Sequence, residues 1–383
     1  MRIMILGADG YLGWPTSMAL SMRGHEIYAV DNYLRRNIAR ETDSEPLVAC
    51  PNLNERAELF ASASGKKIHA AIVDCTDFRR LERLVEEFQP EAVVHYAEQP
   101  SAPYSMIGYL EAQRTLQNNI GSTFNITWSI LKHVPDCHLI KLGTMGEYGT
   151  PNIDIEEGWL DVEHHGRKQT FLYPRQAGSL YHTTKVLDTD LLWFYVRTYG
   201  MRVTDLMQGP VYGCDSGESF ADDRLISHFH YDDIFGTVVN RFLVQAVARV
   251  PLTVYGKGGQ TRGYLNLKDT LQCIEIAIRN PAKVGELRIL NQFTEQFTVN
   301  ELARRIQAAA KIIGITVDIN SIPNPRIELE EHYYNARHSA LIELGLSPNL
   351  MSEEVLVEML EWIRSHRDAI NLKKIQPRVS WSK

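Results

Sequence analysis

The sequence predicts an α/β fold: a doubly wound parallel sheet followed by a smaller, mixed α/β domain. Three observations predict it. A short apolar strand runs directly into a glycine-rich turn, apolar strands and helical segments then alternate along the first half, and 383 residues suffice for a second unit. Alternation of this kind is typical of parallel sheets, because each parallel pair of strands needs a crossover connection.

The first half supplies the strands and helices of the predicted sheet. Short apolar runs, partly β-branched, predict strands, and longer runs with helical spacing predict helices. The predicted strands are Arg2–Leu6, Glu26–Val30, His69–Val73, Ala92–His95, His138–Leu142 and Arg202–Leu206. The predicted helices between them are Trp14–Arg23, Thr76–Phe88, Ile107–Val134 and Ser179–Tyr199.

Two stretches interrupt the alternation. Residues 33–67 are polar and contain prolines, which predicts an inserted excursion with a short helix at Leu53–Ala63. Residues 149–178 are rich in Gly, Pro, Asn and acidic residues and are expected to form a loop. We expect residues 1–208 to form the sheet domain. Residues 209–383 should form mainly the second domain, with parts packing back on the sheet. Its expected helices are Asn240–Ala248, Leu267–Arg279, Val299–Lys311 and Glu353–His366.

Composition excludes several classes of protein. The formal net charge of -7 argues against a nucleic-acid-binding surface, which needs basic patches. No apolar run is long enough to cross a bilayer, and the N-terminal one is too short for a signal peptide. The five cysteines contain no Cys-x-x-Cys pair, so we expect no disulfide framework and no metal site. We therefore expect a reduced, cytoplasmic protein without membrane insertion.

A dinucleotide-binding pattern follows the first strand. Gly7, Gly10 and Gly13 are spaced as G-x-x-G-x-x-G between that strand and a helix. A pyrophosphate must approach such a turn closely, and the N–H groups and dipole of the helix N-terminus favour its charge. Asp31 ends the second strand, where a carboxylate accepts hydrogen bonds from ribose hydroxyls and repels a 2′-phosphate. The order of these features predicts a Rossmann-type domain that binds NAD rather than NADP.

Other cofactor contacts are less determined. Arg35 and Arg36 either contact the adenine or the phosphates, or form a solvated pair. Asp74 ends the third strand and either hydrogen-bonds the adenine or serves as a turn residue. The full set of candidate NAD contacts is Gly7, Asp9, Gly10, Tyr11, Leu12, Gly13, Asp31, Asn32, Arg36, Asp74, Cys75, Ala97, Asn119, Tyr181 and Lys185.

A Tyr-x-x-x-Lys pair opens a later helix. Tyr181 and Lys185 are four residues apart and therefore share a helix face. A nearby ammonium stabilises tyrosinate, so we expect Lys185 to lower the pKa of Tyr181. The phenol would then exchange a proton with a sugar or alcohol hydroxyl near neutral pH. Lys185 could also hold the nicotinamide ribose, and Thr144 ends the fifth strand nearby.

With the glycine turn, these residues resemble the extended short-chain dehydrogenases/reductases that act on nucleotide sugars, over essentially the whole chain. Within that group the chain is most similar to the UDP-sulfoquinovose synthase family. Long strings of residues carry the closer resemblance: Glu98-Gln99-Pro100-Ser101-Ala102-Pro103-Tyr104-Ser105-Met106, Gly143-Thr144-Met145-Gly146-Glu147-Tyr148-Gly149-Thr150-Pro151-Asn152, Asn324-Pro325-Arg326 and His332-Tyr333-Tyr334-Asn335. The insertion after Asp31 also resembles that family. Plant-type members are expected to have Arg where this chain has Pro100, which puts one anionic contact in doubt.

The resemblance implies a reaction and its catalytic residues. UDP-glucose and sulfite would become UDP-sulfoquinovose through 4-keto and 4-keto-5-ene intermediates, with NAD acting catalytically. Tyr181 would take the proton of the 4-hydroxyl, and Thr144 would hydrogen-bond that oxygen. Sugar 4,6-dehydratases typically carry Asp-Glu after this Thr, whereas Met145 and Gly146 follow it here, with Glu147 displaced by one residue. Met145, Glu147 and His182 complete the catalytic candidates, and which residue takes the carbon-5 proton stays open.

The resemblance also implies substrate contacts and an assembly. The segments around Tyr255 and Arg262 are similar to the superfamily's nucleotide-clamping region, where a guanidinium would bind the diphosphate. The candidate substrate contacts are Gln99, Ser101, Thr144, Gln208, Gln260, Arg262 and Arg326, with Arg224 as a weaker one. Superfamily relatives commonly pair through two helices, so a homodimer or higher homo-oligomer is expected.

Two other functions fit parts of the pattern. A UDP-glucose 4-epimerase or related epimerase/dehydratase needs only NAD, Thr144, Tyr181 and Lys185, but the long strings quoted above argue against it. A catalytically inactive NAD-sensing module is the other alternative. Such modules often lose the Tyr or the Lys, and both are present here.

Overall fold

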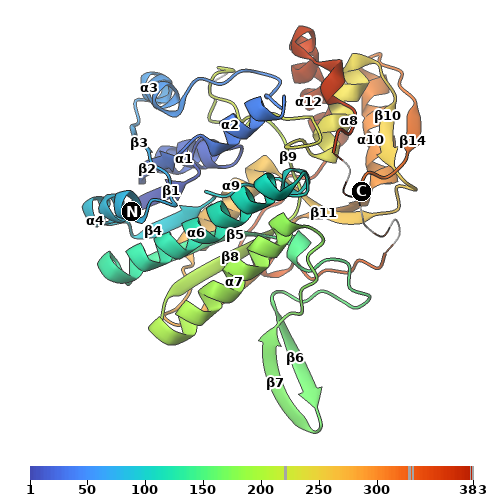
Figure 1. Cartoon of the computed structure of the whole chain (residues 1–383). Coiled ribbons are helices and arrows are strands. Elements are labelled where there is room, and N and C mark those ends of the chain that lie inside the picture. Colours follow the sequence, from blue (N-terminus) through green and yellow to red (C-terminus); the bar gives the residue numbers. More distant parts are fainter. Residues whose placement is uncertain (220–221, 327–328, 330–331, 380, 382–383) are drawn as a thin grey trace.

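A parallel sheet of seven strands forms the centre of the computed structural model, which describes residues 1–219, 222–326, 329, 332–379 and 381 (Figure 1). Its strands are β1 (Arg2–Leu6), β2 (Glu26–Asp31), β3 (Ile68–Ile72), β4 (Ala92–His95), β5 (His138–Thr144), β8 (Arg202–Gln208) and β12 (Leu287–Gln292). Their spatial order is β12-β8-β5-β4-β1-β2-β3, and every neighbouring pair is parallel. The strand order therefore reverses beside β1 and β4, and open α/β sheets bind ligands at such a point.

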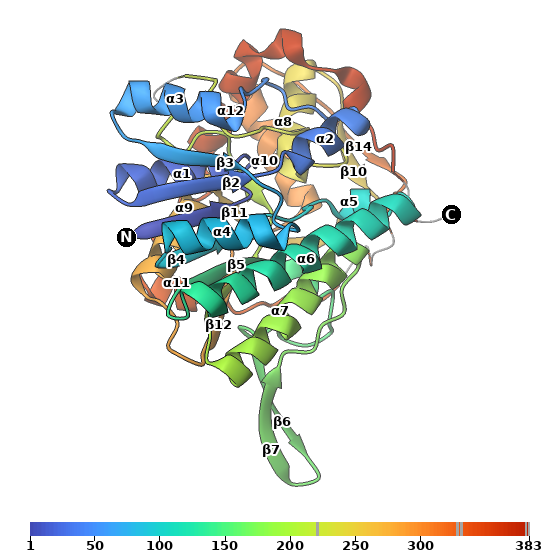
Figure 2. The same cartoon turned by 60° about the vertical axis from the view of Figure 1, so that its left-hand side comes forward.

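Helices cover both faces of the sheet, which is why its strands are apolar on both sides. Successive residues alternate: Ile3 belongs to one core cluster and Met4 to the other. On the face of Met4 lie α4 (Phe78–Phe88), α6 (Tyr109–His133) and α7 (Leu180–Tyr199), which Figure 2 shows side by side. On the face of Ile3 lie α1 (Gly13–Met22), α3 (Leu53–Ser64), α9 (Leu267–Arg279) and α11 (Ala340–Glu343).

A third core cluster lies in the C-terminal half, where Phe242, Leu302 and Leu360 are fully buried. It joins α8 (Val238–Ala248), α10 (Val299–Ile312) and α12 (Glu353–Ser365) to β10 (Leu252–Tyr255), which pairs with β14 (Ile319–Ile322). Three further strands, β13 (Glu295–Thr298), β11 (Thr261–Asn266) and β9 (Val211–Tyr212), form a small separate sheet. The strand β12, from this half of the chain, pairs with β8 at the edge of the main sheet. The boundary at residue 208 stays a prediction.

The six predicted strands and the principal helices are confirmed, with ends shifted by a few residues. The expectation of a loop over residues 149–178 is wrong. Residues 159–172 form a hairpin of β6 (Trp159–His164) and β7 (Arg167–Leu172) that projects from the body (Figures 1 and 2). Its turn residues, His165 and Gly166, have φ of 49° and 74°, as two-residue hairpin turns require. Its strands are mostly exposed and polar, so they lack the apolar runs that predict strands.

The insertion contains two helices, of which the sequence predicted one. The predicted α3 begins at a capping box, in which Asn52 and Glu55 satisfy each other's backbone N–H groups. The unexpected α2 (Leu34–Glu41) buries only Ile38 and Ala39, so its apolar pattern is too short to predict a helix. The remaining short helices are α5 (Ala102–Ser105) and the 3-10 turns η1 (Met145–Glu147), η2 (Arg367–Ala369) and η3 (Leu372–Lys374). Across the described residues, none of the helices has the length and apolar character that a membrane span requires.

Candidate active site

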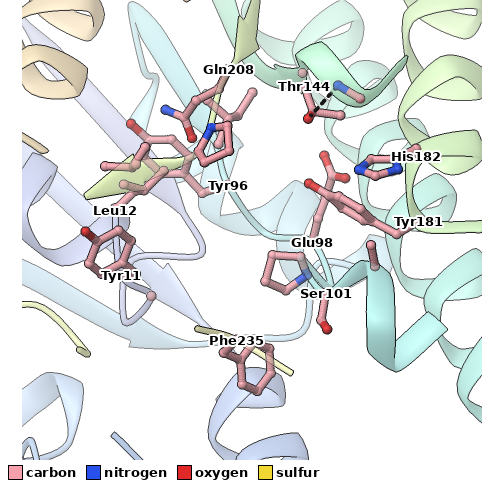
Figure 3. Close-up of a pocket in the computed structure, with 18 of the residues that line it drawn as sticks. Tyr11, Leu12, Tyr96, Glu98, Ser101, Thr144, Tyr181, His182, Gln208 and Phe235 are labelled. Carbon is pink, nitrogen blue, oxygen red and sulfur yellow. Dashed lines mark hydrogen bonds between the residues drawn. The ribbon is translucent and has the colours of Figure 1, made fainter. Parts of the chain in front are cut away.

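A cavity of about 500 Å³ opens at the carboxyl ends of the central strands (Figure 3). Gly7 follows β1, Tyr96 follows β4, and Thr144 and Gln208 end β5 and β8, and all four residues line it. The cavity therefore lies where the strand order reverses. A second cavity of about 240 Å³ adjoins it and shares Arg262 and Arg326 with it. Within the described ranges, no group of three or more His, Cys, Asp and Glu side chains is placed to hold a metal ion.

The glycine turn forms one wall of the cavity. Gly7 has φ of 80°, and a Cβ there would lie 2.6 Å from the carbonyl carbon of Tyr96. A Cβ on Gly13 would lie 2.1 Å from the carbonyl oxygen of Gly7. Both glycines are thus required for the turn to pack against β4 and against itself. Gly7, Gly10, Tyr11, Leu12 and Gly13 all line the cavity, at the N-terminus of α1. A dinucleotide pyrophosphate fits such a terminus.

Asp31 and Asn32 line the cavity beside this turn. The Asp31 carboxylate accepts hydrogen bonds from the backbone N–H groups of Asp9 (2.9 Å) and Tyr33 (2.6 Å), which fix its orientation. Burial, and then the charge of Asp9, raises the pKa of Asp31 to about 6. The carboxyl is therefore ionised at neutral pH and able to accept hydrogen bonds from ribose hydroxyls.

The pKa of Asp31 makes NAD binding dependent on pH. As the pH falls through about 6, Asp31 takes up a proton and loses acceptor capacity. We expect the affinity for NAD to fall over that range, as measured by calorimetric titration at pH values on either side of 6. The Asp31→Asn variant should bind NAD weakly at both. An equal pH dependence in the variant would show that another group titrates.

The two adjacent arginines of α2, Arg35 and Arg36, contact different parts of the protein. Arg36 forms a bidentate ion pair with the buried Asp9, with N–O distances of 2.5 and 2.7 Å, and neither residue lines the cavity. Arg56, fully buried over the ring of Trp14, lies 3.6 Å from the same carboxylate. This cluster attaches the insertion to the glycine turn. Arg35 lines the cavity instead, with its guanidinium 4.8 Å from the ring centroid of Phe235.

The other candidate cofactor residues also form two groups: some line the cavity, and the others do not. Cys75 and Ala97 line the cavity. Asp74 does not: its carboxylate accepts hydrogen bonds from the backbone and hydroxyl of Thr76, in a turn. Asn119 lies behind the lining, where its Oδ1 accepts a hydrogen bond from the N–H of Gln99 at 2.8 Å. The turn residue and the asparagine thus support the wall, whereas Cys75 and Ala97 form it.

Thr144, Tyr181 and His182 face the cavity from β5 and from the first turn of α7 (Figure 3). Ser179 caps α7 and also lies 3.0 Å from Nδ1 of His182. The backbone N–H of Tyr181 donates to the hydroxyl of Ser105 at 3.1 Å. Met145 lines the cavity as well. The two hydroxyls and the imidazole therefore face the same part of the cavity, across from Tyr11 and Leu12 of the glycine turn (Figure 3).

Lys185 lies below the cavity lining, and its ammonium is already paired. Its Nζ lies 2.7 Å from Oε2 of Glu98 and donates to the carbonyl of Leu142 at 2.5 Å. It is 5.8 Å from the ring centroid of Tyr181. Burial, and then the charge of Glu98, raises the pKa of Tyr181 above its usual value. Contrary to the expectation from the sequence, the pKa of Tyr181 is raised rather than lowered, because burial dominates and the ammonium of Lys185 is paired with Glu98.

Glu147 lies outside the cavity, in a buried ionic network. Its carboxylate lies 3.3 Å from Nζ of Lys141, 3.2 Å from the hydroxyl of Thr189 and 3.3 Å from the backbone N of Thr144. Lys141 also lies 3.3 Å from Asp205. Glu147 can thus hold Thr144 in place, but it does not face the space where a sugar would lie.

His182 is neutral at physiological pH. Burial, and then the charges of Arg262 and Arg326, lowers its pKa to about 3. Its ring packs against Gly146, where a Cβ would lie 2.5 Å from Nε2. A neutral imidazole at the cavity wall can accept a proton, and its conjugate acid releases one readily.

The candidate substrate residues occupy both cavities. Ser101 and Gln208 line the first cavity, whereas Gln99 is buried behind it and donates to Ser101 and Thr115. Gln260 lines the second cavity. Arg224 lines neither: it pairs with Asp222 at the surface. Pro100, at the position where plant-type relatives are expected to have Arg, lines the first cavity and supplies no charge.

Sequence reasoning missed Glu98, Arg241 and Trp381. Glu98 contacts Lys185 across 87 positions of sequence, and Arg241 lies over the ring of Tyr255, 4.0 Å from its centroid, in the second cavity. Trp381 lines both cavities, and Arg326 lies over its ring. For Glu98 the available signal is its position just after β4, at the carboxyl end of a strand of the sheet.

Comparisons with known proteins agree with this geometry. The model of the NAD dependent epimerase/dehydratase family matches residues 3–291. The chloroplastic UDP-sulfoquinovose synthase of Spinacia oleracea is 47% identical over 382 residues, which are 100% of this chain and 79% of that protein. The UDP-sulfoquinovose synthase of Sulfolobus acidocaldarius is 41% identical over 386 residues. The match covers 100% of this chain and 98% of that protein.

Solved structures support the fold. The UDP-glucose 4-epimerase from Bifidobacterium longum, in complex with NAD+ and UDP, superimposes with a TM-score of 0.73 at 19% identity. The match covers 97% of this chain and 100% of that one. At this identity the likeness concerns the fold alone, whereas the two sequence relatives match over the whole chain. The chain therefore belongs to the NAD-dependent epimerase/dehydratase family and, within it, to the UDP-sulfoquinovose synthases.

Proposed function

We propose that the chain converts UDP-glucose and sulfite into UDP-sulfoquinovose and water, with NAD regenerated in each cycle. The observation that carries the proposal is the meeting of Thr144, Tyr181 and His182 in the cavity that the glycine turn and Asp31 also line. Both relatives that match the whole of this chain are named UDP-sulfoquinovose synthase, which supports the same reaction. NAD, when bound, supplies hydride chemistry at carbon 4 of the sugar.

The first step is oxidation at carbon 4. The hydroxyl of Thr144 hydrogen-bonds the sugar 4-oxygen, and Tyr181 takes the proton from it. Both side chains face the cavity, from β5 and α7 (Figure 3). Lys141 and Glu147 hold the backbone around Thr144 and Lys185 through hydrogen bonds of 3.1 to 3.3 Å. The reacting hydroxyls are therefore positioned by a rigid support.

The second step exchanges the 6-hydroxyl for sulfonate. The 4-ketone acidifies the carbon-5 proton, and the neutral imidazole of His182 accepts it. Its conjugate acid then passes this proton to the departing 6-hydroxyl, which leaves as water. Bisulfite sulfur then bonds to carbon 6, and the bisulfite proton goes to carbon 5. Return of the hydride and the proton to carbon 4 completes the cycle.

The arginines would bind the anionic groups. Arg262 and Arg326 line both cavities, and a guanidinium binds phosphate bidentately. We assign the diphosphate to Arg262 and Arg326, and the uridine to the second cavity, with Gln260 and Arg241 on its walls. Since Pro100 is uncharged, the same two arginines also supply the positive field that attracts sulfite.

Mass spectrometry of the products tests the function. Purified protein is incubated with UDP-glucose and NAD, with and without sulfite. A sulfonated nucleotide sugar formed only with sulfite is the expected result. UDP-galactose in both samples would identify an epimerase, and a 4-keto-6-deoxy sugar would identify a dehydratase. No conversion by a chain that binds NAD would favour the NAD-sensing module.

We also infer that two copies of the chain pair through α6 and α7. Large apolar side chains are exposed on these helices: Phe124, Trp128, Phe194 and Tyr199 are 37% to 51% exposed. An exposed apolar face of this kind is typical of a protein–protein interface. Sedimentation velocity should give a dimer that Phe194→Asp dissociates, and a monomeric parent chain would refute the inference. A cytoplasmic location stays part of the proposal.

A further inference from the structure

The C-terminal segment, residues 371–379, follows α12 and contacts two distant parts of the chain. The first is the insertion. The guanidinium of Arg378 donates hydrogen bonds to the carbonyl oxygens of Thr42 and Asp43, at 2.8 and 3.1 Å. It also donates to the hydroxyl of Ser44 at 3.0 Å. These three residues directly follow α2, so the C-terminal segment is fixed to the end of that helix.

The second part is segment 231–237, which Arg378 holds through the carboxylate of Asp233. Nε and Nη2 of Arg378 donate to one carboxylate oxygen, at 3.0 and 2.8 Å. The backbone N–H groups of Arg378 and Val379 donate to the other oxygen, at 2.6 and 2.9 Å. Hydrogen bonds between charged groups are stronger than neutral ones, and the side chain of Asp233 is only 8% exposed. One arginine therefore joins the C-terminal segment, the insertion and segment 231–237.

An apolar cluster lies beside this ion pair. Ile38 of α2, Tyr104 of α5 and Ile234 are buried together, and Phe235 and Val379 pack against them. Ile234 and Val379 are also the sequence neighbours of the two charged residues, so the cluster and the ion pair belong to one junction. Four parts of the chain that are far apart in the sequence meet there. The burial of their apolar side chains stabilises the junction that the ion pair closes.

This junction forms one wall of the first cavity. Residues 234–237 line the cavity, and Figure 3 shows the ring of Phe235 at its edge. Arg35 of α2 lines the same wall, with its guanidinium 4.8 Å from the centroid of that ring. The helix α2 closely follows Asp31, the residue expected to bind the NAD ribose, so this wall borders the cofactor's part of the cavity. Arg378 lines neither cavity and acts on the wall only through its contacts.

We propose that Arg378 and Asp233 form a latch, which keeps segment 231–237 closed against the insertion and retains bound NAD during the catalytic cycle. The proposed reaction takes a hydride from carbon 4 and returns it to the same carbon. If reduced NAD escaped in between, the ketone would have no reductant and the cycle would stop. Arg378 is thus a positioning residue for the cofactor. The purpose of the latch rests on the proposed function, whereas its effect on NAD release does not depend on the substrate.

The release of reduced NAD tests the latch without any substrate. Protein loaded with NADH is mixed with an excess of NAD, and the change in nicotinamide fluorescence gives the dissociation rate constant. Arg378→Ala should raise this rate constant by about 10- to 100-fold, since hydrogen bonds to charged groups contribute on that order. Arg378→Lys keeps the charge but loses most of the donors, so its rate constant should be intermediate. Arg364→Ala, which breaks an exposed ion pair with Glu361 on α12, should match the parent chain.

A double variant tests whether the two residues act as one unit. Asp233→Ala should also speed the release of NADH. Arg378→Ala/Asp233→Ala should release NADH no faster than the quicker single variant, because either change alone opens the latch. Effects that multiply would refute the latch, since each residue would then act on its own. If Arg378→Ala fails to fold, Lys374→Ala breaks a milder contact of the same segment, 2.8 Å from Glu45, and should give a smaller increase.

Turnover and UDP binding provide independent readouts. With UDP-glucose and sulfite, Arg378→Ala should need more NAD for its half-maximal rate, and should reach the parent rate when NAD is saturating. Calorimetric titration with UDP measures the nucleotide's site separately. An unchanged release of NADH, together with weaker binding of UDP, would refute the proposal and assign the C-terminal segment to the substrate. A parent chain inactive towards UDP-glucose and sulfite would contradict the proposed function and leave the NADH measurement valid.

Discussion

The Tyr181→Phe variant is expected to lose about 10²- to 10⁴-fold in the rate of product formation, the usual range for removal of a general acid–base group. The substitution removes one hydroxyl and leaves the ring, which fills the same space. NAD should still bind, since the glycine turn and Asp31 lie on the other side of the cavity. Mass spectrometry of the product formed over time measures the rate, and calorimetric titration measures the affinity for NAD.

Tyr173→Phe is the matched control for this experiment. Tyr173 is 1% exposed, and its hydroxyl donates to the carbonyl of Asp154 at 3.0 Å, away from both cavities. Loss of that hydrogen bond should cost about 1 kcal/mol of stability and no activity. If Tyr181→Phe kept its turnover, the Tyr-x-x-x-Lys pair would be structural, and the proton chemistry would belong to another group.

Much of the fold could be predicted because each buried parallel strand produces a recognisable local pattern in the sequence. Strands such as β1 and β4 are buried on both faces, so they appear as short apolar runs that end at a turn. The hairpin of β6 and β7 lacks this signal. Its strands are largely exposed, and they are ordered by the antiparallel ladder between them, by cross-strand pairs such as Asp161 with Thr170, and by the contact of Trp159 with Trp193 at the base.

Site residues were predictable where the backbone geometry permits only one residue type, or where they lie beside a recognisable motif. Gly7 and Gly13 stand where any side chain would strike the backbone, so their spacing alone identifies the turn. Arg35 and Arg36 show the opposite case. They are neighbours on α2, and only the position of Asp9 after folding directs Arg36 to an ion pair and leaves Arg35 at the cavity.

Glu98 and Glu147 could not be assigned from the sequence for the same reason. The contact of Glu98 with Lys185 exists only because β4 and α7 meet in the sheet domain. Glu147 is two residues past a cavity residue, Met145, but the 3-10 turn directs its carboxylate into the interior, towards Lys141. A sequence pattern places both near the catalytic residues, and tertiary packing alone decides which one faces the cavity.

The interior ionic network should make Lys141 the most sensitive position for stability. The side chain is fully buried, and its ammonium lies 3.0 Å from Thr189 and 3.3 Å from both Glu147 and Asp205. Burial alone lowers the pKa of Lys141, but Asp205 and Glu147 outweigh it and raise the pKa above its usual value. Lys141→Met should lower the free energy of unfolding by about 3–5 kcal/mol, as expected when one partner of a buried ion group is removed.

The direction of the pH dependence distinguishes this cause from a simple packing defect. Burial already raises the pKa of Glu147, and Lys141 is the charge that most opposes this shift, so without Lys141 the pKa of Glu147 in the folded variant rises further above that in the unfolded chain. The folded variant then binds more protons than the unfolded one, and its stability increases as the pH falls. The cost of Lys141→Met, measured by urea denaturation, should therefore shrink from neutral to acidic pH. Adding Glu147→Gln and Asp205→Asn to Lys141→Met should recover part of the lost free energy of unfolding.

The matched control is Lys132→Met, which removes an ammonium that is 61% exposed and should cost less than about 1 kcal/mol. A cost for Lys141→Met that did not change with pH would mean that lost contacts, rather than unpaired carboxylates, destabilise the variant.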